Sequence, residues 1–139
     1  MTHSQRWIKT LMEGLDAQVD ETVRTSILEN CGRGCISRRF IDKAKSIKKR
    51  SKDINDFLEK LSHEWKHLHL EKGNICVVYE KCYCPIVRDY REKLSPSFCN
   101  CSRGWIKELF ESVLEKPVEV KLKKSIVRGD GDCEFRVYL

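Results

Sequence analysis

The chain has 139 residues, of which 40% are hydrophobic and 35% are charged, and its formal net charge is +6. Seven glycines and three prolines are too few for a collagen-like or low-complexity chain, and no run of about 18 apolar residues predicts a transmembrane helix. Lys9 and Glu13 interrupt the apolar residues near the start, so we expect no secretory signal. These features predict one globular domain, 1–139, in the cytoplasm and without a membrane partner.

The first stretch of the sequence has helical periodicity. Its apolar residues recur every three or four positions, which predicts one helix over 5–30 with this apolar face: Trp7, Ile8, Leu11, Met12, Leu15, Val19, Val23 and Ile27. We expect Trp7 and Met12 to fill the core. Gly14 is a point where the helix could loosen or split, and Gly32 is expected to end it.

Two more helices are predicted before residue 66, over 36–50 and 53–66. Ser51 or Asp53 can cap the second of them. The first carries a basic run that extends to Lys52. Because no aromatic residues are interleaved with these charges, we expect a solvated helix face and no nucleic-acid partner.

The second part of the domain, 67–139, changes to strand periodicity. Residues 68–80 predict a β-hairpin, and Ser102 is expected to cap a helix that runs to Lys116. The segments 118–122 and 133–139 alternate with period two and predict a second hairpin. The order predicts an α+β fold, in which N-terminal helices (1–66) pack on a small antiparallel sheet made of two hairpins with a helix between them.

Eight cysteines stand out in a chain of this composition, and six of them form three close pairs: Cys31 and Cys35, Cys82 and Cys84, Cys99 and Cys101. In a reducing compartment, clustered thiols indicate metal ligation, redox chemistry or a nucleophile. Zinc or iron is the metal we expect if such a cluster binds one. Arg33 would lower the pKa of the first pair. The remaining two, Cys76 and Cys133, lie on predicted strands and are expected to be small core residues.

The two Cys-x-Cys pairs bracket residues 85–98, whose few apolar residues are spread among charges. Core burial alone would order such a loop poorly, whereas a shared metal or a disulfide would remove loop entropy. We therefore predict that Cys82, Cys84, Cys99 and Cys101 converge on one site, with Cys31 and Cys35 near it.

His63-Glu64-Trp65-Lys66-His67 matches the His-Glu-x-x-His pattern of zinc proteases. The match straddles the predicted end of a helix, Trp65 belongs to the apolar face, and no convincing third ligand follows. We interpret it as a coincidence of sequence.

The last third of the chain combines Gly104-Trp-Ile, a helix ending before Pro117, an alternating strand and a Gly-Asp-Gly-Asp-Cys-Glu-Phe turn and strand. This order resembles the closing motif of the vinyl-reductase-type small-molecule-binding domain and of the L-2-amino-thiazoline-4-carboxylate hydrolase-like proteins, over about residues 100–139. The upstream cysteine pairs resemble a cysteine-rich prokaryotic branch of this group. The motif residues are Gly129, Asp130, Cys133 and Phe135. Ser125 stands where vinyl-reductase-type domains often carry another cysteine.

The resemblance implies helices packed on an antiparallel sheet and a ligand pocket between them. Together with the thiols, it predicts a small-molecule-binding domain whose cysteine cluster binds a metal or senses redox state. The alternative is a hydrolase in which a thiolate attacks a small sulfur heterocycle. The sequence assigns no catalytic residue, so enzyme activity stays open, and a homodimer is compatible with it.

Overall fold

The computed structural model describes residues 2–81, 83–84 and 95–139. Within them the α-helices are α1 (His3–Gln18), α2 (Glu21–Cys35), α3 (Arg38–Lys49), α4 (Ile54–Glu64) and α5 (Asn100–Leu114). The short 3-10 helices are η1 (Pro96–Cys99) and η2 (Ile126–Arg128). The strands are β1 (Leu68–Glu71), β2 (Asn74–Tyr79), β3 (Glu119–Lys124) and β4 (Cys133–Tyr138).

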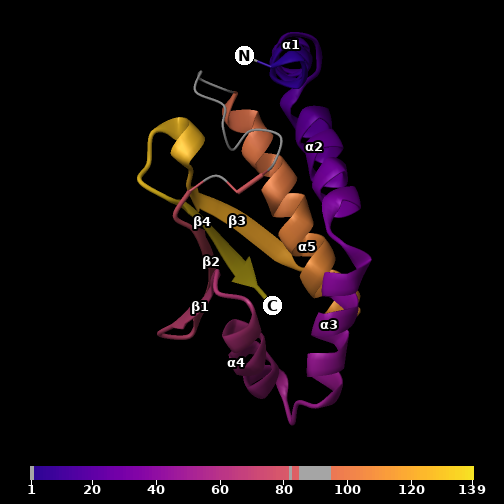
Figure 1. The fold of residues 1–139 in the computed structure, drawn as a ribbon, viewed down its shortest axis with the longest axis vertical. Helices are drawn as coiled ribbons and strands as arrows, with labels where there is room; N and C mark the ends of the chain where they lie inside the picture. The colour runs from indigo at the N-terminus through magenta and orange to yellow at the C-terminus, as the bar shows by residue number, and fades with distance from the viewer. Residues whose placement is uncertain (1, 82, 85–94) are drawn as a thin grey trace.

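The strands of the described residues form one antiparallel sheet in the order β1-β2-β4-β3. Each hairpin is closed locally, and the pairing of β2 with β4 joins the two hairpins. Val77 lies opposite Phe135, and Tyr79 lies opposite Cys133. Helix α5 runs across the sheet, and α2 lies alongside α5 (Figure 1). The predicted α+β class and the pairing of 118–122 with 133–139 are therefore confirmed.

Helices α2 and α5 cross at two glycines with almost no space between their backbones. A methyl group at Gly32 would overlap the carbonyl oxygen of Cys101, and one at Gly104 would overlap the carbonyl oxygen of Glu29. Ion pairs flank the crossing: Arg33 lies 2.8 Å from Glu111, and Lys107 lies 3.1 Å from Glu29. The lack of side chains at both glycines is what lets the helices approach this closely.

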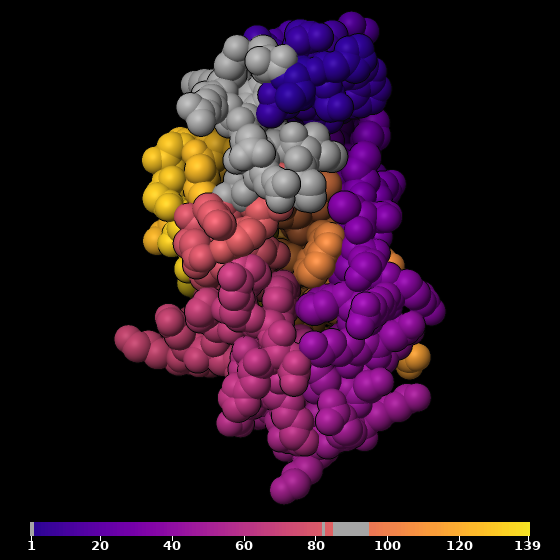
Figure 2. All heavy atoms as spheres, in the orientation of Figure 1, coloured from indigo at the N-terminus to yellow at the C-terminus, as the bar shows by residue number. Residues whose placement is uncertain are grey.

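The hydrophobic core has two parts. The larger part joins the sheet to helices α3, α4 and α5 and includes the fully buried rings of Phe57, Phe110 and Phe135. The smaller part lies under α1 and consists of Ile8, Met12, Leu28 and Phe98. Helix α1 thus has its own small core at one end of the molecule, while α4 lies at the other end (Figures 1 and 2).

The prediction of a single helix over 5–30 is wrong. The structure has two helices there, and the second ends later than predicted. Val19 adopts an extended conformation, and Asp20 starts a new helix by accepting a hydrogen bond from the backbone N–H of Val23. The break therefore comes from this cap and not from Gly14. Helix α2 then continues past Gly32 to Cys35, because Gly32 is buried against α5 and packs there as part of the helix.

The expected core role of the first apolar face is only partly correct. Met12 is buried, with 1% of its surface exposed, but Trp7 is 62% exposed. Leu11, Val23 and Ile27 are exposed as well. Periodicity identifies a helix face, but the size of the surface available to cover that face is a tertiary property.

Helix α5 begins earlier than its predicted cap. Ser102 lies inside the helix, which starts at Asn100 directly after η1, and Ser95 caps η1 instead. At the other end, Glu115 closes α5 in the left-handed conformation, just before Pro117. Elsewhere Asp53 caps α4 as predicted. Among residues 2–81, 83–84 and 95–139, no helix combines the length and apolar composition needed to cross a membrane.

The glycine crossing yields a first prediction. Gly32→Ala should lower the free energy of unfolding by about 3 kcal/mol, because a methyl group there cannot fit without separating the helices. Gly34→Ala, in the same helix, is the matched control: nothing lies within 4 Å of its Cβ, so stability should stay equal or rise. Urea denaturation monitored by circular dichroism measures both variants. Equal stability of the two alanine variants would contradict the prediction.

Candidate functional site

A cavity of about 300 Å³ opens where the end of α2, the start of α5 and the adjoining ends of β2 and β4 meet. Six aromatic side chains line it: Trp65, Tyr79, Tyr83, Phe98, Trp105 and Phe135. Five cysteines line it as well: Cys35, Cys84, Cys99, Cys101 and Cys133. An apolar, aromatic wall with few polar groups is the usual character of a small-molecule site.

The helix crossing brings thiols from distant parts of the sequence to this cavity. Gly32 packs against the backbone of Cys101, so Cys35, one turn further along α2, lies beside the first turn of α5. Cys99 ends η1 and Cys101 lies in the first turn of α5, which places both sulfurs at the same corner. The sheet supplies Cys133, directly opposite Tyr79 in the β2–β4 register.

Burial controls the acidity of these thiols. It raises the pKa of Cys101 to about 12, and nearby thiols raise it too: Cys84, Cys35, Cys31 and Cys99. Burial also raises the pKa of Cys99, although a hydrogen bond to Ser125 opposes the effect. A thiolate in an apolar cavity lacks the solvation that water gives it. Cys99 and Cys101 are therefore neutral thiols at physiological pH.

A tight turn around Ser125 fixes one wall of the cavity. The Ser125 hydroxyl is fully buried, 2.9 Å from the Cys99 sulfur, and its backbone N–H donates to Asp130 at 2.7 Å. Gly129 closes η2 at φ 102°, a conformation that favours glycine. The Ile126 N–H donates to the Cys133 sulfur at 3.3 Å. The Gly-Asp motif therefore builds the turn, and Cys133 and Phe135 face the cavity.

A histidine and two tyrosines form another part of the wall. The His67 ring lies 4.7 Å from the Tyr79 ring and 4.8 Å from the Tyr83 ring. Burial lowers the pKa of His67, so its imidazole is neutral near pH 7. Its Nδ1 lies 3.2 Å from the Val78 carbonyl oxygen, which can only accept, so Nδ1 carries the hydrogen and Nε2 is an acceptor. Burial also raises the pKa of Tyr79 far above its usual range.

Positive charge gathers at the mouth. Lys81 is the only permanently charged side chain among the described residues that line the cavity. Its Nζ lies 5.2 Å from the centre of the Tyr83 ring, and Lys66 Nζ lies at 5.3 Å from the same ring. The Tyr83 hydroxyl donates a hydrogen bond to Glu80 at 2.6 Å. The described lining contains no carboxylate, and Lys66 and Lys81 together outweigh the single negative charge of Glu80 beside them, so the local field favours an anionic group.

The structure brings four of the six predicted site cysteines to the cavity wall: Cys35, Cys84, Cys99 and Cys101. Cys31 is exposed on α2, close enough for its charge to affect the pKa of Cys101. Cys82 lies outside the described residues. Cys76 is buried, as expected of a core residue, but Cys133 lines the cavity. Arg33, which was expected to act on the first cysteine pair, pairs with Glu108 and Glu111, and its effect on those thiols stays a prediction.

No metal centre emerges from the described ranges: no three His, Cys, Asp or Glu side chains there are arranged to hold an ion. Zinc or iron remains a prediction, since Cys82 falls outside those ranges. None of the seven described cysteines is in a disulfide.

The His-Glu-x-x-His match is broken by the fold. Helix α4 ends at Glu64, and Trp65 leaves the helix in an extended conformation, so His63 and His67 do not share a helix face. Glu64 instead pairs with Lys43 at 3.0 Å. His67 belongs to the cavity, a role that the motif did not suggest. The signal in the sequence for this position was the strand pattern that follows His67.

The fold and the cavity define an α+β protein with a thiol-lined aromatic pocket between its sheet and its helices. Over residues 1–139 the chain matches the family of unknown function DUF6144, and it belongs to that family. No curated protein matched the chain. No solved structure matched it either. The resemblance to vinyl-reductase-type and thiazoline hydrolase-like proteins stays a prediction.

The thiol environment yields a second prediction. With iodoacetamide at about pH 8, exposed Cys31 should react within the first phase and Cys101 last, because only the thiolate is alkylated. The Cys101 rate should still rise between about pH 9 and 11, because its pKa lies near 12 in the folded state. Peptide mass spectrometry follows each site, and the urea-unfolded chain is the control. Equal rates at Cys31 and Cys101 in the folded protein would contradict this.

A third prediction concerns the broken motif. Glu64→Gln should leave the fold and any bound zinc unchanged, because Glu64 is an exposed partner of Lys43 and lies outside the cavity wall. Metal analysis of the purified protein and thermal denaturation measure the two quantities. Loss of one equivalent of zinc in this variant would show that the motif does bind metal.

Proposed function

We propose that this protein binds a small aromatic molecule carrying one anionic group, and that the thiol-lined cavity is the binding site. The observation that carries the proposal is the cavity itself, about 300 Å³ of space walled by aromatic rings and cysteines with one lysine at its mouth. Its size is at the lower end for ligand sites, which favours a ligand smaller than a typical cofactor.

The aromatic walls favour a flat apolar body. Trp65 and Trp105 lie 5.6 Å apart between ring centres, and Phe40 packs against both, so the two indoles are held in place. Tyr79 also contacts the buried ring of Phe135. Rings fixed in this way offer stacking and edge contacts to an aromatic ligand at little entropic cost.

The polar groups favour an anion. Lys81 attracts negative charge at the mouth, and Lys66 adds to it across Tyr83. His67 is neutral and presents Nε2 as an acceptor, so it can receive a hydrogen bond from a ligand hydroxyl or amine. The lysines and the acceptor nitrogen of His67 together favour an aromatic acid that also carries one hydrogen-bond donor.

The thiols favour a protein whose ligand affinity changes when its cysteines form a disulfide or bind a metal. Disulfide formation or a soft metal at the cavity corner would change the shape of the wall that the ligand contacts. Free cysteines are maintained in a reducing compartment, so the cytoplasm is the location we propose. The zinc or iron expected of the cluster belongs to this proposal as an alternative state of the same thiols.

Hydrolysis by a thiolate is the weaker alternative. A nucleophilic cysteine needs a lowered pKa, from a basic neighbour or a helix N-terminus. Cys99 and Cys101 have raised pKa values instead. Neither of these two thiols is therefore proposed as a nucleophile, and binding is the function that we propose.

A matched pair of probes tests the proposal. Naphthalene-2-carboxylate should bind in ligand-observed NMR and shift Trp fluorescence, and naphthalen-2-ylmethylamine should bind more weakly. Lys81→Met should weaken the carboxylate about fivefold. The control is Lys121→Met, since Lys121 also lies over a tyrosine, Tyr138, at 5.3 Å but far from the cavity.

Two results would oppose the proposal. If both probes bound with equal affinity to the wild type and to Lys81→Met, the site would have no preference for an anion. If neither probe bound, the cavity would not be a site for an aromatic ligand. Alkylating the thiols with N-ethylmaleimide should abolish carboxylate binding if the cysteines wall the occupied space. Unchanged binding after complete alkylation would place the ligand elsewhere.

A further inference from the structure

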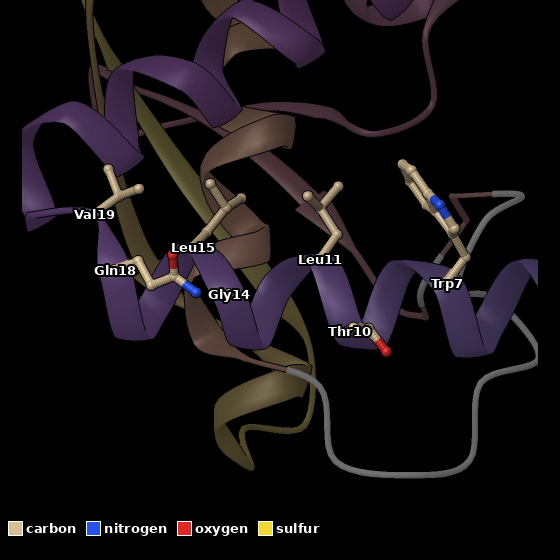
Figure 3. Close-up of a pocket in the computed structure, with 7 residues that line it drawn as sticks. All are labelled: Trp7, Thr10, Leu11, Gly14, Leu15, Gln18 and Val19. Carbon is tan, nitrogen blue, oxygen red and sulfur yellow. The ribbon is translucent and has the colours of Figure 1, made fainter.

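Helix α1 presents an apolar face that the rest of the described chain leaves uncovered. Figure 3 shows Trp7, Leu11, Leu15 and Val19 projecting from the same side of the helix, along a surface groove of about 400 Å³. Trp7 is 62% exposed and Leu11 is 41% exposed. Large apolar side chains aligned along one helix and open to water give a partner a surface to pack against.

A gap in side-chain bulk lies within this face. Gly14 lines the groove, and nothing lies within 4 Å of the position its Cβ would take. Thr10, one turn earlier, is also small and exposed. Together they leave a notch in the ridge of large side chains, of the kind into which a side chain from another helix can pack.

The charges of α1 are divided between its halves. The N-terminal half carries His3, Arg6 and Lys9, and the C-terminal half carries Glu13 and Asp16. This order opposes the helix macrodipole, which favours acidic residues at the start and basic residues at the end. The stability of α1 as an isolated helix therefore does not explain this order of charges.

We infer that this face of α1 binds the α1 of a second copy of this chain, antiparallel and about a two-fold axis near Thr10. Trp7 and Gly14 are seven residues apart, and so are Arg6 and Glu13, so each pair lies on one side of the helix. The midpoints of both pairs fall next to Thr10, so one two-fold axis there brings the first member of each pair close to the second member of that pair in the other copy. Each Trp7 then meets the notch at Gly14 of the partner subunit, and each Arg6 faces Glu13 of the partner subunit.

The same features argue against a lipid surface as the occupant. An interfacial helix usually carries mainly lysine and arginine on its polar face, whereas the polar residues of α1 are of both signs. Antiparallel pairing matches those signs and also opposes the two macrodipoles. A 16-residue helix is about 24 Å long, so the contact is small and the dimer weak.

Sedimentation velocity on the full chain over a range of concentrations tests the inference. The wild type should show a monomer–dimer equilibrium with a Kd on the order of 10–100 µM. Arg6→Glu and Glu13→Arg should each weaken it roughly tenfold, and the double variant should restore it, because the reversal re-creates opposite charges across the axis. Arg38→Glu, a charge reversal at an exposed position of α3, is the control and should change nothing.

Two more variants separate association from folding. Trp7→Ala should abolish the dimer with little change in thermal stability, since Trp7 is mostly exposed in a single copy. Gly14→Ala should raise helix stability and yet weaken the dimer, because it fills the notch. A wild-type chain that is monomeric at every concentration would overturn the inference. So would a double charge variant that does not regain the wild-type Kd.

Discussion

The close crossing of α2 and α5 is the constraint on which the rest of the structure depends. Backbone contact at Gly32 and Gly104 sets the distance between the two helices, and the ion pairs of Arg33 and Glu29 fix their rotation. Because α5 also packs on the sheet, this contact brings the end of α2 to the cavity that the ends of β2 and β4 line. The cavity lies at that point, and its volume depends on how closely the two helices approach.

Burial at this crossing also determines the chemistry of the thiols. Several sulfurs gather in an apolar corner, and desolvation there outweighs the opposing charges of Arg128 and Arg103 near Cys99, so the thiol pKa values of Cys99 and Cys101 are raised. The same desolvation keeps His67 and Tyr79 neutral. The cavity is therefore an uncharged aromatic and thiol surface whose fixed charge, Lys81, lies at the mouth. These properties suit binding better than nucleophilic catalysis.

Helix α1 differs from the rest of the molecule in its energetics. It contributes Ile8 and Met12 to a small separate core, whereas the main core joins the sheet to α3, α4 and α5. Little of its apolar face is used in folding the single chain, which leaves Trp7 and Leu11 open to water. Structural stability and the proposed association thus rest on different helices, and changes to α1 can affect one without the other.

The sequence by itself determined the local elements and their faces. Period-two alternation predicted the second hairpin, the strand and turn residues of 68–80 predicted the first, and Asp53 was a predicted cap of α4, because these features depend on nearby residues alone. It also indicated that the cysteine pairs gather. Only the tertiary structure decided that Gly32 continues a helix, that Trp7 is exposed and that His67, Tyr79 and Trp105 line one cavity. Those outcomes depend on contacts between residues distant in the chain, for which periodicity carries no signal.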